Sequence, residues 1–397
     1  MRIAFYLAFD LNPQNGGIER VTNILTKEFV AAGHQVYFVS YISEPEAEHT
    51  ALAADRLVLP DRKKLCSREN QTKFTDFINK NSVDIIVAQH SHDMEFATLP
   101  FLVKQNTNVK ILYVFHPTPF IQSLSIADTS YPILKSERTL PRLWRRMGRI
   151  ILKRQKQKSK NNKMGKHLKR LHEMGDYILV SSEKYIDGIL KISGIQSREK
   201  LFAIANPNTY REEDIQTAQK ENILIFVGRL SEEKHPEKIM LIWKHIQDRF
   251  PQWNLKILGE GKLKHELEEL HKQLKLERCS IEGRQEPTPY YAKAKILLLA
   301  SDFEGFPMSI TEAMQHGVIP VAFNSFEALS GIIEENVTGI SVTPYSLQEY
   351  EEKLAALMNN EEKIAKMSVA TRKSISRFSA PDIAVEWIGL FRKLGVQ

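Results

Sequence analysis

The chain has 397 residues, which is too long for one ordinary hydrophobic core, so two domains of similar size are expected. Hydrophobic residues make up 42% of it and charged residues 26%, as in folded globular proteins, which argues against a disordered or fibrous chain. The net charge of +7 comes from one segment, because residues 138–172 hold 14 of the 55 Lys and Arg residues and no Asp or Glu.

Cysteine content and apolar runs indicate the compartment. Cys66 and Cys279 lie far apart and lack the spacing of a disulfide framework or a metal site, which favours a reducing compartment. The apolar start of the chain meets Asp10 and Pro13 too soon for a signal peptide. Every apolar run is shorter than the ~20 residues that cross a bilayer. We therefore expect a cytoplasmic protein without a membrane span.

In the first half, short apolar runs alternate with amphipathic stretches of helical length, the pattern of a parallel sheet covered by helices. The clearest helix follows Gly16 and Gly17, has apolar positions at 18, 21, 24, 25 and 29, and ends before Gly33. The predicted strands cover residues 2–9, 35–40, 84–89, 109–116, 177–182 and 201–206.

The second half repeats this alternation after a polar interval that starts at Asn206-Pro207-Asn208. Its predicted strands cover residues 223–227, 254–259, 279–283, 296–301, 318–323 and 338–343, and a last helix covers 380–394. We therefore expect an N-terminal domain over 1–206, a C-terminal domain over 207–379 and a closing helix within 380–397.

Residues 301–317 are the most informative stretch, with a strand end, a Gly/Pro turn and the start of a helix. In doubly wound sheets ligands bind beyond the carboxyl ends of strands, and a helix N-terminus there offers amides to phosphates. A diphosphate would fit, with Glu304 and Glu312 accepting hydrogen bonds from hydroxyl groups on either side. Two structural alternatives stay open. Ser309 to Glu312 fits a capping box, and this is the favoured interpretation of Glu312 when it is considered alone. Glu304 can be an ordinary turn carboxylate.

Two cations follow the strand predicted at 223–227. Arg229 offers planar bidentate donors and Lys234 a point charge, and together they would stabilise the negative charge of a departing nucleoside diphosphate. Lys234 precedes a helix predicted to begin near Pro236, where the helix dipole disfavours a cation unless an anion is bound. The alternative is a solvated loop.

Together these segments resemble the retaining glycosyltransferases of the GT-B fold, specifically glycosyltransferase family 4, over essentially the whole chain. This implies an α/β fold of two Rossmann-like domains that face a central cleft, with the C-terminal helix crossing back to the N-terminal domain. The matching motifs are Gly16-Gly17-Ile18-Glu19-Arg20, Gly228-Arg229-Leu230 with Lys234, Leu258-Gly259-Glu260-Gly261, Tyr290-Tyr291-Ala292-Lys293-Ala294, and Glu304-Gly305-Phe306-Pro307 with Glu312-Ala313-Met314 and Gly317.

The resemblance also assigns roles. It implies that Arg229 and Lys234 hold the donor diphosphate, that Glu312 binds the ribose hydroxyls and that Glu304 binds the hydroxyls of the donor sugar. Gly16 and Gly17 would let the backbone approach the phosphates and the acceptor closely, because they lack a Cβ. The phosphate cradle would be completed by the turn residues Gly305, Phe306, Pro307, Met308 and Ser309, through the amides of 306 to 309.

His116 matches the strand-terminal histidine that faces the donor sugar in this family, although without the resemblance it is an isolated histidine with no assigned task. His90 and His92 are weaker candidates for the acceptor side. The sequence has no Asp-x-Asp motif, and Asp302-Phe303-Glu304 is only superficially similar to one. We expect no metal ion and no other cofactor, because Arg229, Lys234 and the helix terminus can meet the leaving-group charge.

The basic segment predicts a membrane contact. Residues 142–154 place Leu143, Met147, Ile150 and Ile151 on one helical face among cations, as in an interfacial helix. We expect an anionic membrane surface to bind residues 142–172 and the protein to lie on the inner face of the cell membrane. Nucleic acid is not expected, because no nucleic-acid-binding motif is present. A solvated insertion is the structural alternative.

The sequence thus predicts transfer of a hexose-type sugar, preferably from a UDP-sugar, to a glycan or lipid-linked acceptor in bacterial surface polysaccharide or lipopolysaccharide synthesis. The alternatives are another GT-B sugar-nucleotide enzyme, such as an epimerase or a phosphorylase, and a non-catalytic membrane-surface binding protein. Lys234 and Glu304 are expected in exposed loops, so that replacing either by Ala lowers turnover and leaves folding intact.

Overall fold

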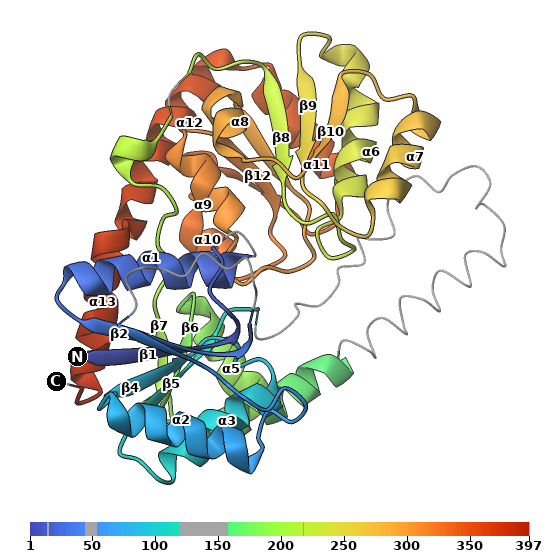
Figure 1. Ribbon diagram of the computed structural model, residues 1–397. Coiled ribbons are helices and arrows are strands. Elements are labelled where there is room, and N and C mark those ends of the chain that lie inside the picture. Colours follow the sequence, from blue (N-terminus) through green and yellow to red (C-terminus); the bar gives the residue numbers. More distant parts are fainter. Residues whose placement is uncertain (14–15, 44–53, 119–157, 217, 397) are drawn as a thin grey trace, which may run out of the picture. The chain divides into compact units, whose positions relative to one another are not determined.

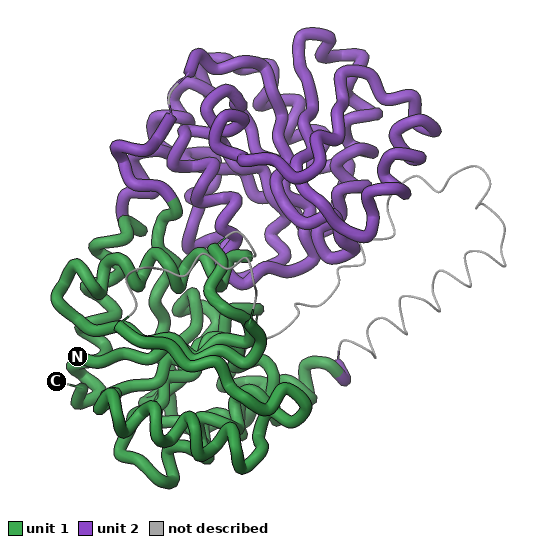
Figure 2. Tube along the Cα trace, in the orientation of Figure 1, with its two compact units in different colours: residues 1–120, 160–209, 378–397 green, residues 121–159, 210–377 purple. Residues whose placement is uncertain are grey.

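The computed structural model describes residues 1–13, 16–43, 54–118, 158–216 and 218–396. The chain folds into two compact units (Figure 2). Unit 1 comprises residues 1–120, 160–209 and 378–397, and unit 2 comprises 121–159 and 210–377. Most of the predicted basic insertion, residues 138–157, lies outside the described residues.

Unit 1 is built on a parallel sheet with the strand order β3-β2-β1-β4-β5-β6-β7 among the described residues. The apolar runs form these strands because their side chains are buried between layers of helices, as is usual for parallel sheets. The strands are β1 (Arg2–Phe9), β2 (Gln35–Ile42), β3 (Asp55–Val58), β4 (Ile85–Ala88), β5 (Lys110–Phe115), β6 (Tyr177–Val180) and β7 (Leu201–Ala203).

Helices cover both faces of this sheet, with α1 on one face and α2 and α3 on the other (Figure 1). Phe29 of α1 stacks on Phe5 of β1, and its other edge meets Trp387 and Phe391 of the last helix, α13. The C-terminal helix therefore packs on the first helix of unit 1. The helices are α1 (Gly17–Ala31), α2 (Arg68–Lys80), α3 (Met94–Lys104), an unlabelled helix over 158–174, α5 (Lys184–Ser193) and α13 (Ala380–Lys393).

Unit 2 has a second parallel sheet with the order β10-β9-β8-β11-β12-β13. Leu224, Leu298 and Val321 of its central strands have no exposed surface and form one core with Trp243. The strands are β8 (Ile223–Val227), β9 (Asn254–Leu258), β10 (Cys279–Gly283), β11 (Ile296–Leu299), β12 (Ile319–Phe323) and β13 (Ile340–Val342).

The helices of unit 2 alternate with its strands along the chain, as the sequence pattern predicted. They are α6 (Pro236–Ile246), α7 (Lys264–Leu274), α8 (Thr288–Lys293), α9 (Met308–Gln315), α10 (Leu329–Ile332), α11 (Leu347–Met358) and α12 (Glu361–Ser374), with 3-10 turns at Glu212–Asp214, Gln247–Arg249 and Ile375–Phe378. No helix of the described residues is long and apolar enough to cross a membrane.

The predicted two-domain α/β fold is thus confirmed, with one strand missed. Strand β3 was not predicted, because Asp55–Val58 has only two apolar residues and is half-exposed. In both sheets the order of the strands reverses next to the first strand of the unit, between β1 and β4 and between β8 and β11. Ligands of open parallel sheets bind beyond the strand ends at such reversal points.

Candidate functional site

In unit 2 the reversal point brings together the two loops that carry the predicted donor residues. Strands β8 and β11 pair in parallel, so their carboxyl ends lie at the same edge of the sheet. Arg229 and Lys234 follow β8, and Glu304 follows β11. The amide of Asp302 donates to the carbonyl of Glu233 over 2.8 Å, which joins the two loops through the backbone.

A glycine-rich turn supports the first of these loops. Residues 259–261, which follow β9, pack against the backbone of 228–230, and the amide of Leu230 donates to the carbonyl of Glu260 over 2.9 Å. A Cβ on Gly259 would lie 1.9 Å from the carbonyl oxygen of Gly228, and one on Gly261 would lie 2.2 Å from that of Leu230. Both positions require glycine because two backbones touch there.

Lys234 and Glu304 form an ion pair between Nζ and Oε1. The hydroxyl of Ser301 donates to the same carboxylate oxygen over 2.7 Å. The side chains of Lys234 and Glu304 are 23% and 10% exposed, so the expectation that both lie in exposed loops is wrong. Their contact with each other, and the Ser301 hydroxyl on the same carboxylate, accompany this burial.

Arg229 is exposed on the same loop. Burial raises the pKa of the nearby Glu233 carboxyl, but the Ser231 hydroxyl and the charges of Arg229 and Lys234 outweigh it and hold this pKa below its ordinary value. Arg229 is thus an exposed cation that can approach an anionic ligand at this loop.

The turn from Gly305 to Ser309 leads into helix α9. Pro307 is the N-cap residue, and no side chain caps this helix. The capping-box alternative for Glu312 is therefore wrong, because the helix starts at Met308 and Glu312 lies too far along it to reach the cap. Glu312 is buried, and the hydroxyl of Tyr291 lies 3.4 Å from its carboxylate.

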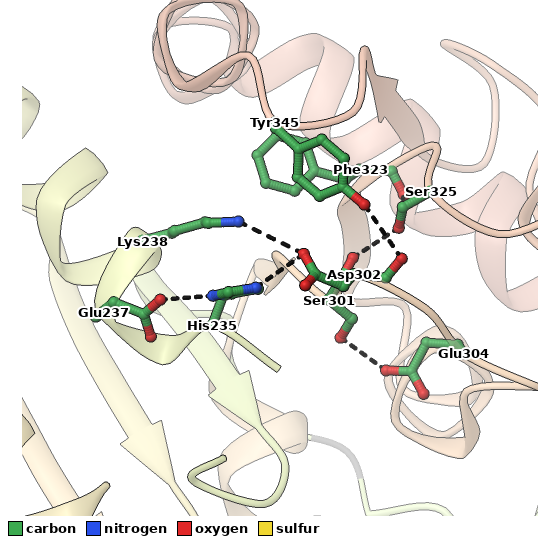
Figure 3. A network of polar contacts seen from close by, with 9 residues as sticks. All are labelled: His235, Glu237, Lys238, Ser301, Asp302, Glu304, Phe323, Ser325 and Tyr345. Carbon is green, nitrogen blue, oxygen red and sulfur yellow. Dashed lines mark hydrogen bonds and ion pairs between the residues drawn. The ribbon is translucent and has the colours of Figure 1, made fainter. Parts of the chain in front are cut away.

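Near Glu304 lies a polar network that the sequence did not indicate (Figure 3). The ring of His235 lies between the carboxylates of Glu237 and Asp302, 2.6 Å and 2.8 Å from its two nitrogens. Lys238 Nζ lies 3.6 Å from the same Asp302 oxygen. In the sequence, only its place directly before Pro236, at the start of a predicted helix, could have drawn attention to His235.

In unit 1 the corresponding reversal point lies beside Gly16 and Gly17, which precede and open α1. A Cβ on Gly16 would lie 2.9 Å from Glu19 Oε2, so the buried Glu19 carboxylate sits against this turn. The amide of Ala8 donates to His90 Nδ1 over 3.2 Å, which leaves Nε2 of a neutral ring to face Glu19 Oε1 at 3.9 Å. Burial lowers the pKa of His90 to about 4.

His116 follows β5, and its Nε2 lies 2.5 Å from Oε1 of the fully buried Gln89. Burial, together with His90 and His92, lowers the pKa of His116 to about 3, so the ring is neutral near pH 7. The rings of His90 and His92 are 5.9 Å apart. The predicted residues of the first half thus cluster in unit 1 and those of the second half in unit 2.

The described residues contain no group of three or more His, Cys, Asp or Glu side chains that could hold a metal ion. The expectation of a reaction without a metal ion stays a prediction.

Comparison with known families finds one family model for each half of the chain. The model of "Glycosyltransferase Family 4" matches residues 15–207, and that of "Glycosyl transferases group 1" matches residues 210–374. The two matches meet where unit 1 gives way to unit 2.

Curated relatives match over parts of their length. An uncharacterized glycosyltransferase of Haemophilus influenzae is 28% identical over 224 residues, which are 55% of this chain and 64% of that protein. A Campylobacter jejuni α-1,4-N-acetyl-D-galactosaminyltransferase, named for an undecaprenol-pyrophosphate-linked acceptor, is 28% identical over 179 residues, 44% of this chain and 49% of its own. The chain thus spans about half to two thirds of the length of these relatives.

Among solved structures, HepE of Anabaena in complex with UDP and glucose superposes with a TM-score of 0.73 at 16% identity, covering 99% of this chain and 100% of HepE. This likeness shows a shared fold. By its two parallel-sheet α/β units and by the family model that matches each of them, the chain belongs to the glycosyltransferases of the GT-B type.

Proposed function

We propose that the protein transfers a hexose-type sugar from a nucleotide-diphosphate sugar, preferably a UDP-sugar, to a glycan or lipid-linked acceptor, with retention of anomeric configuration. The observation that carries this proposal is the Lys234–Glu304 ion pair at the reversal point between β8 and β11, beside the exposed Arg229. Cations at this place suit a diphosphate, and a carboxylate suits sugar hydroxyls.

In this proposal the donor binds in unit 2. Arg229 and Lys234 balance the charge that develops on the departing nucleoside diphosphate, so that no metal ion is needed. Helix α9 begins at Met308, directly after the Gly/Pro turn, and the N-terminus of a helix suits a phosphate. Glu304 would orient the sugar and Glu312 the ribose.

The acceptor side is proposed in unit 1. Gly16 and Gly17 form its turn, the neutral His116 supplies a hydrogen-bonding group, and His90 and His92 lie near His116. The undecaprenol-linked acceptor in the name of the Campylobacter relative supports a lipid-linked glycan, as in bacterial surface polysaccharide or lipopolysaccharide synthesis.

A thermal-shift panel of UDP-, GDP- and ADP-sugars with EDTA present tests the donor. A ligand at 100 times its Kd stabilises a protein by roughly 2.7 kcal/mol, so binding of one class is readily seen. We expect UDP-sugars alone to raise Tm, Lys234→Ala to abolish the shift, and Lys272→Ala, an exposed lysine of α7, to keep it. Equal shifts in both variants would contradict the proposed site.

We further propose that the protein binds the anionic inner surface of the cell membrane through its basic segment. In the helix over 158–174, Gly165, Leu168 and Leu171 are buried, whereas every Lys and Arg side chain is exposed. Each such cation near an anionic surface contributes about 1 kcal/mol of attraction. The exposed cations are Lys158, Lys160, Lys163, Lys166, Lys169 and Arg170.

Flotation with vesicles of phosphatidylglycerol and phosphatidylcholine tests this contact. We expect the wild type to float and a variant with four lysines changed to Gln, Lys158, Lys160, Lys163 and Lys166, to stay at the bottom. A control with the same loss of charge replaces the exposed Lys80, Lys262, Lys272 and Lys366. Equal flotation of both variants would refute a specific membrane face.

A further inference from the structure

His235 has an unusual backbone. It stands between Lys234 and the first residue of α6, with φ 49° and ψ 50°, in the left-handed region. Residues other than glycine seldom adopt this conformation, and they keep it where the surrounding structure holds them there. Contacts of the His235 side chain must therefore offset the conformational cost of this backbone.

Those contacts are two carboxylates, one on each side of the ring. Nδ1 lies 2.6 Å from Glu237 Oε1, and Nε2 lies 2.8 Å from Asp302 Oδ1 (Figure 3). The Nδ1 contact has the geometry of a hydrogen bond, whereas the Nε2 contact with Asp302 is an ion pair without that alignment. A neutral imidazole has one N–H and no charge, whereas an imidazolium can donate to Glu237 and pair by its charge with Asp302. Burial lowers the pKa of His235, but Asp302 and Glu237 outweigh burial and raise it above its ordinary value.

A second cation, Lys238, also faces this ring from near the start of α6. Its Nζ lies 3.6 Å from Asp302 Oδ1 and 4.8 Å from the centre of the Tyr345 ring, and its charge acts to lower the pKa of His235. With His235 protonated, two cations face two carboxylates. When His235 loses its proton, Lys238 is the remaining cation of these four side chains, and one of the two carboxylate charges is no longer balanced.

The ring completes a set of three links between the two loops at the reversal point. The amide of Asp302 donates to the carbonyl of Glu233, Lys234 pairs with Glu304, and His235 lies against the Asp302 carboxylate. Asp302 and Glu304 stand two residues apart, as do Glu233 and His235. The position of Lys234 relative to Glu304 therefore depends on the neighbouring link through His235.

We propose that His235 is a positioning residue: its imidazolium holds the Lys234 loop against the Glu304 loop through Asp302, so that nucleoside diphosphate binding weakens when the ring loses its proton. This inference rests on the proposed function, which places the diphosphate at Lys234. Because the folded protein favours the protonated ring, the contribution of His235 is present at low pH and is lost as the pH rises.

Calorimetric titration with UDP between pH 6.5 and 8.5 tests the proposal in the wild type and in His235→Asn. Asn tolerates the left-handed backbone but carries no charge. The matched control is His245→Asn at the other end of α6, where Nδ1 lies 2.7 Å from Glu351 Oε1. The protonation of UDP itself is the same for all three proteins, so ratios of Kd isolate the effect of the histidine.

We expect UDP to bind His235→Asn about threefold or more weakly than the wild type at pH 6.5. A threefold change in Kd corresponds to a shift of about half a unit in the pKa of His235 when UDP binds. This ratio should approach one at pH 8.5. His245→Asn should match the wild type throughout. A ratio near one at every pH, or a ratio that does not change with pH, overturns the proposal.

Hydrogen exchange without ligand separates this inference from the proposed function. The amide of Asp302, which donates to Glu233, should exchange faster in His235→Asn than in the wild type at pH 6.5. If the wild type binds no UDP, the proposed function fails, while faster exchange in His235→Asn still shows that the ring holds the two loops together. Unchanged exchange overturns the link itself. His235→Gly, which relieves the backbone, should lose the same pH dependence if the Asn variant folds poorly.

Discussion

Lys234 Nζ and Glu304 Oε1 meet where β8 and β11 of unit 2 lie side by side, although 70 residues separate them in sequence. Ser301 donates to the same carboxylate oxygen. The negative charge of Glu304 is therefore already paired with Lys234 before any ligand binds. An anion bound here meets an ion pair rather than two independent groups. Each partner consequently contributes both to binding and to the stability of the loops.

We expect Lys234→Ala to lower kcat/KM for the sugar nucleotide by about 100- to 1000-fold. This is the usual effect of removing one hydrogen-bond donor that stabilises negative charge in a transition state. Unlike the expectation from sequence, it should also destabilise unit 2 by about 1–3 kcal/mol, because Glu304 is mostly buried and loses its cation. Steady-state kinetics and thermal unfolding measure the two effects.

A double-mutant cycle with Glu304→Gln checks whether the two side chains act as a pair. The two changes should couple by about 1–3 kcal/mol in unfolding free energy, since residues in contact are not additive. Lys272→Ala, at an exposed pair with Glu269, should behave as the wild type. Additive losses would show that the ion pair does not form in solution.

The sequence predicted the strands well because each buried strand of a parallel sheet is a continuous apolar run. Intervals of amphipathic pattern, as in Pro236–Ile246, likewise revealed helices. Strand β3 escaped because Asp55 and Arg56 interrupt its short apolar pattern. What the pattern cannot give is the order of strands in the sheet, which depends on tertiary pairing.

The same limit explains what was missed at the site. Arg229, Lys234 and Glu304 could be named because they stand in motifs, but the contact of His235 with Asp302 follows only from the pairing of β8 with β11. The capping-box alternative failed for a related reason, since the helix start is set by Pro307 and not by Ser309. The partial burial of Lys234 could not be predicted either, because loops are polar in sequence whether or not their side chains are buried.

Gly259→Ala should disrupt the loop that carries Arg229. Its Cβ would lie 1.9 Å from the carbonyl oxygen of Gly228, so one backbone must move, at a cost of about 1–3 kcal/mol or more. We expect lower Tm and weaker UDP binding together. In the control Gly389→Ala of α13 the new Cβ meets no atom within 4 Å, and Tm should rise slightly. Unchanged UDP binding in Gly259→Ala would separate this turn from the donor site.

Trp387→Ala should remove the packing of the last helix on unit 1. Trp387 is 3% exposed, and its ring centre lies 6.3 Å from that of Phe29 in α1. Truncating a buried aromatic residue costs about 3–5 kcal/mol. The measurement is thermal unfolding, with Val385→Ala, which is 67% exposed on the same helix, as the control. Similar Tm values for the two variants would mean that α13 does not hold unit 1 together.

His90 and His116 should make unit 1 unstable in acid. Their pKa values, about 4 and about 3, lie below the ordinary value near 6.5, so the unfolded chain takes up protons first as the pH falls. Stability should therefore decrease below about pH 6.5, by at most about 1.4 kcal/mol per pH unit for each ring.

Thermal unfolding at pH 7.5 and 5.0 should show this loss in the wild type and in His265→Asn, an exposed control in unit 2. The loss of stability should be smaller in His116→Asn, because Asn takes up no proton and the buried site beside Gln89 no longer disfavours a protonated side chain. An equal loss in His116→Asn would place the acid sensitivity elsewhere in the fold.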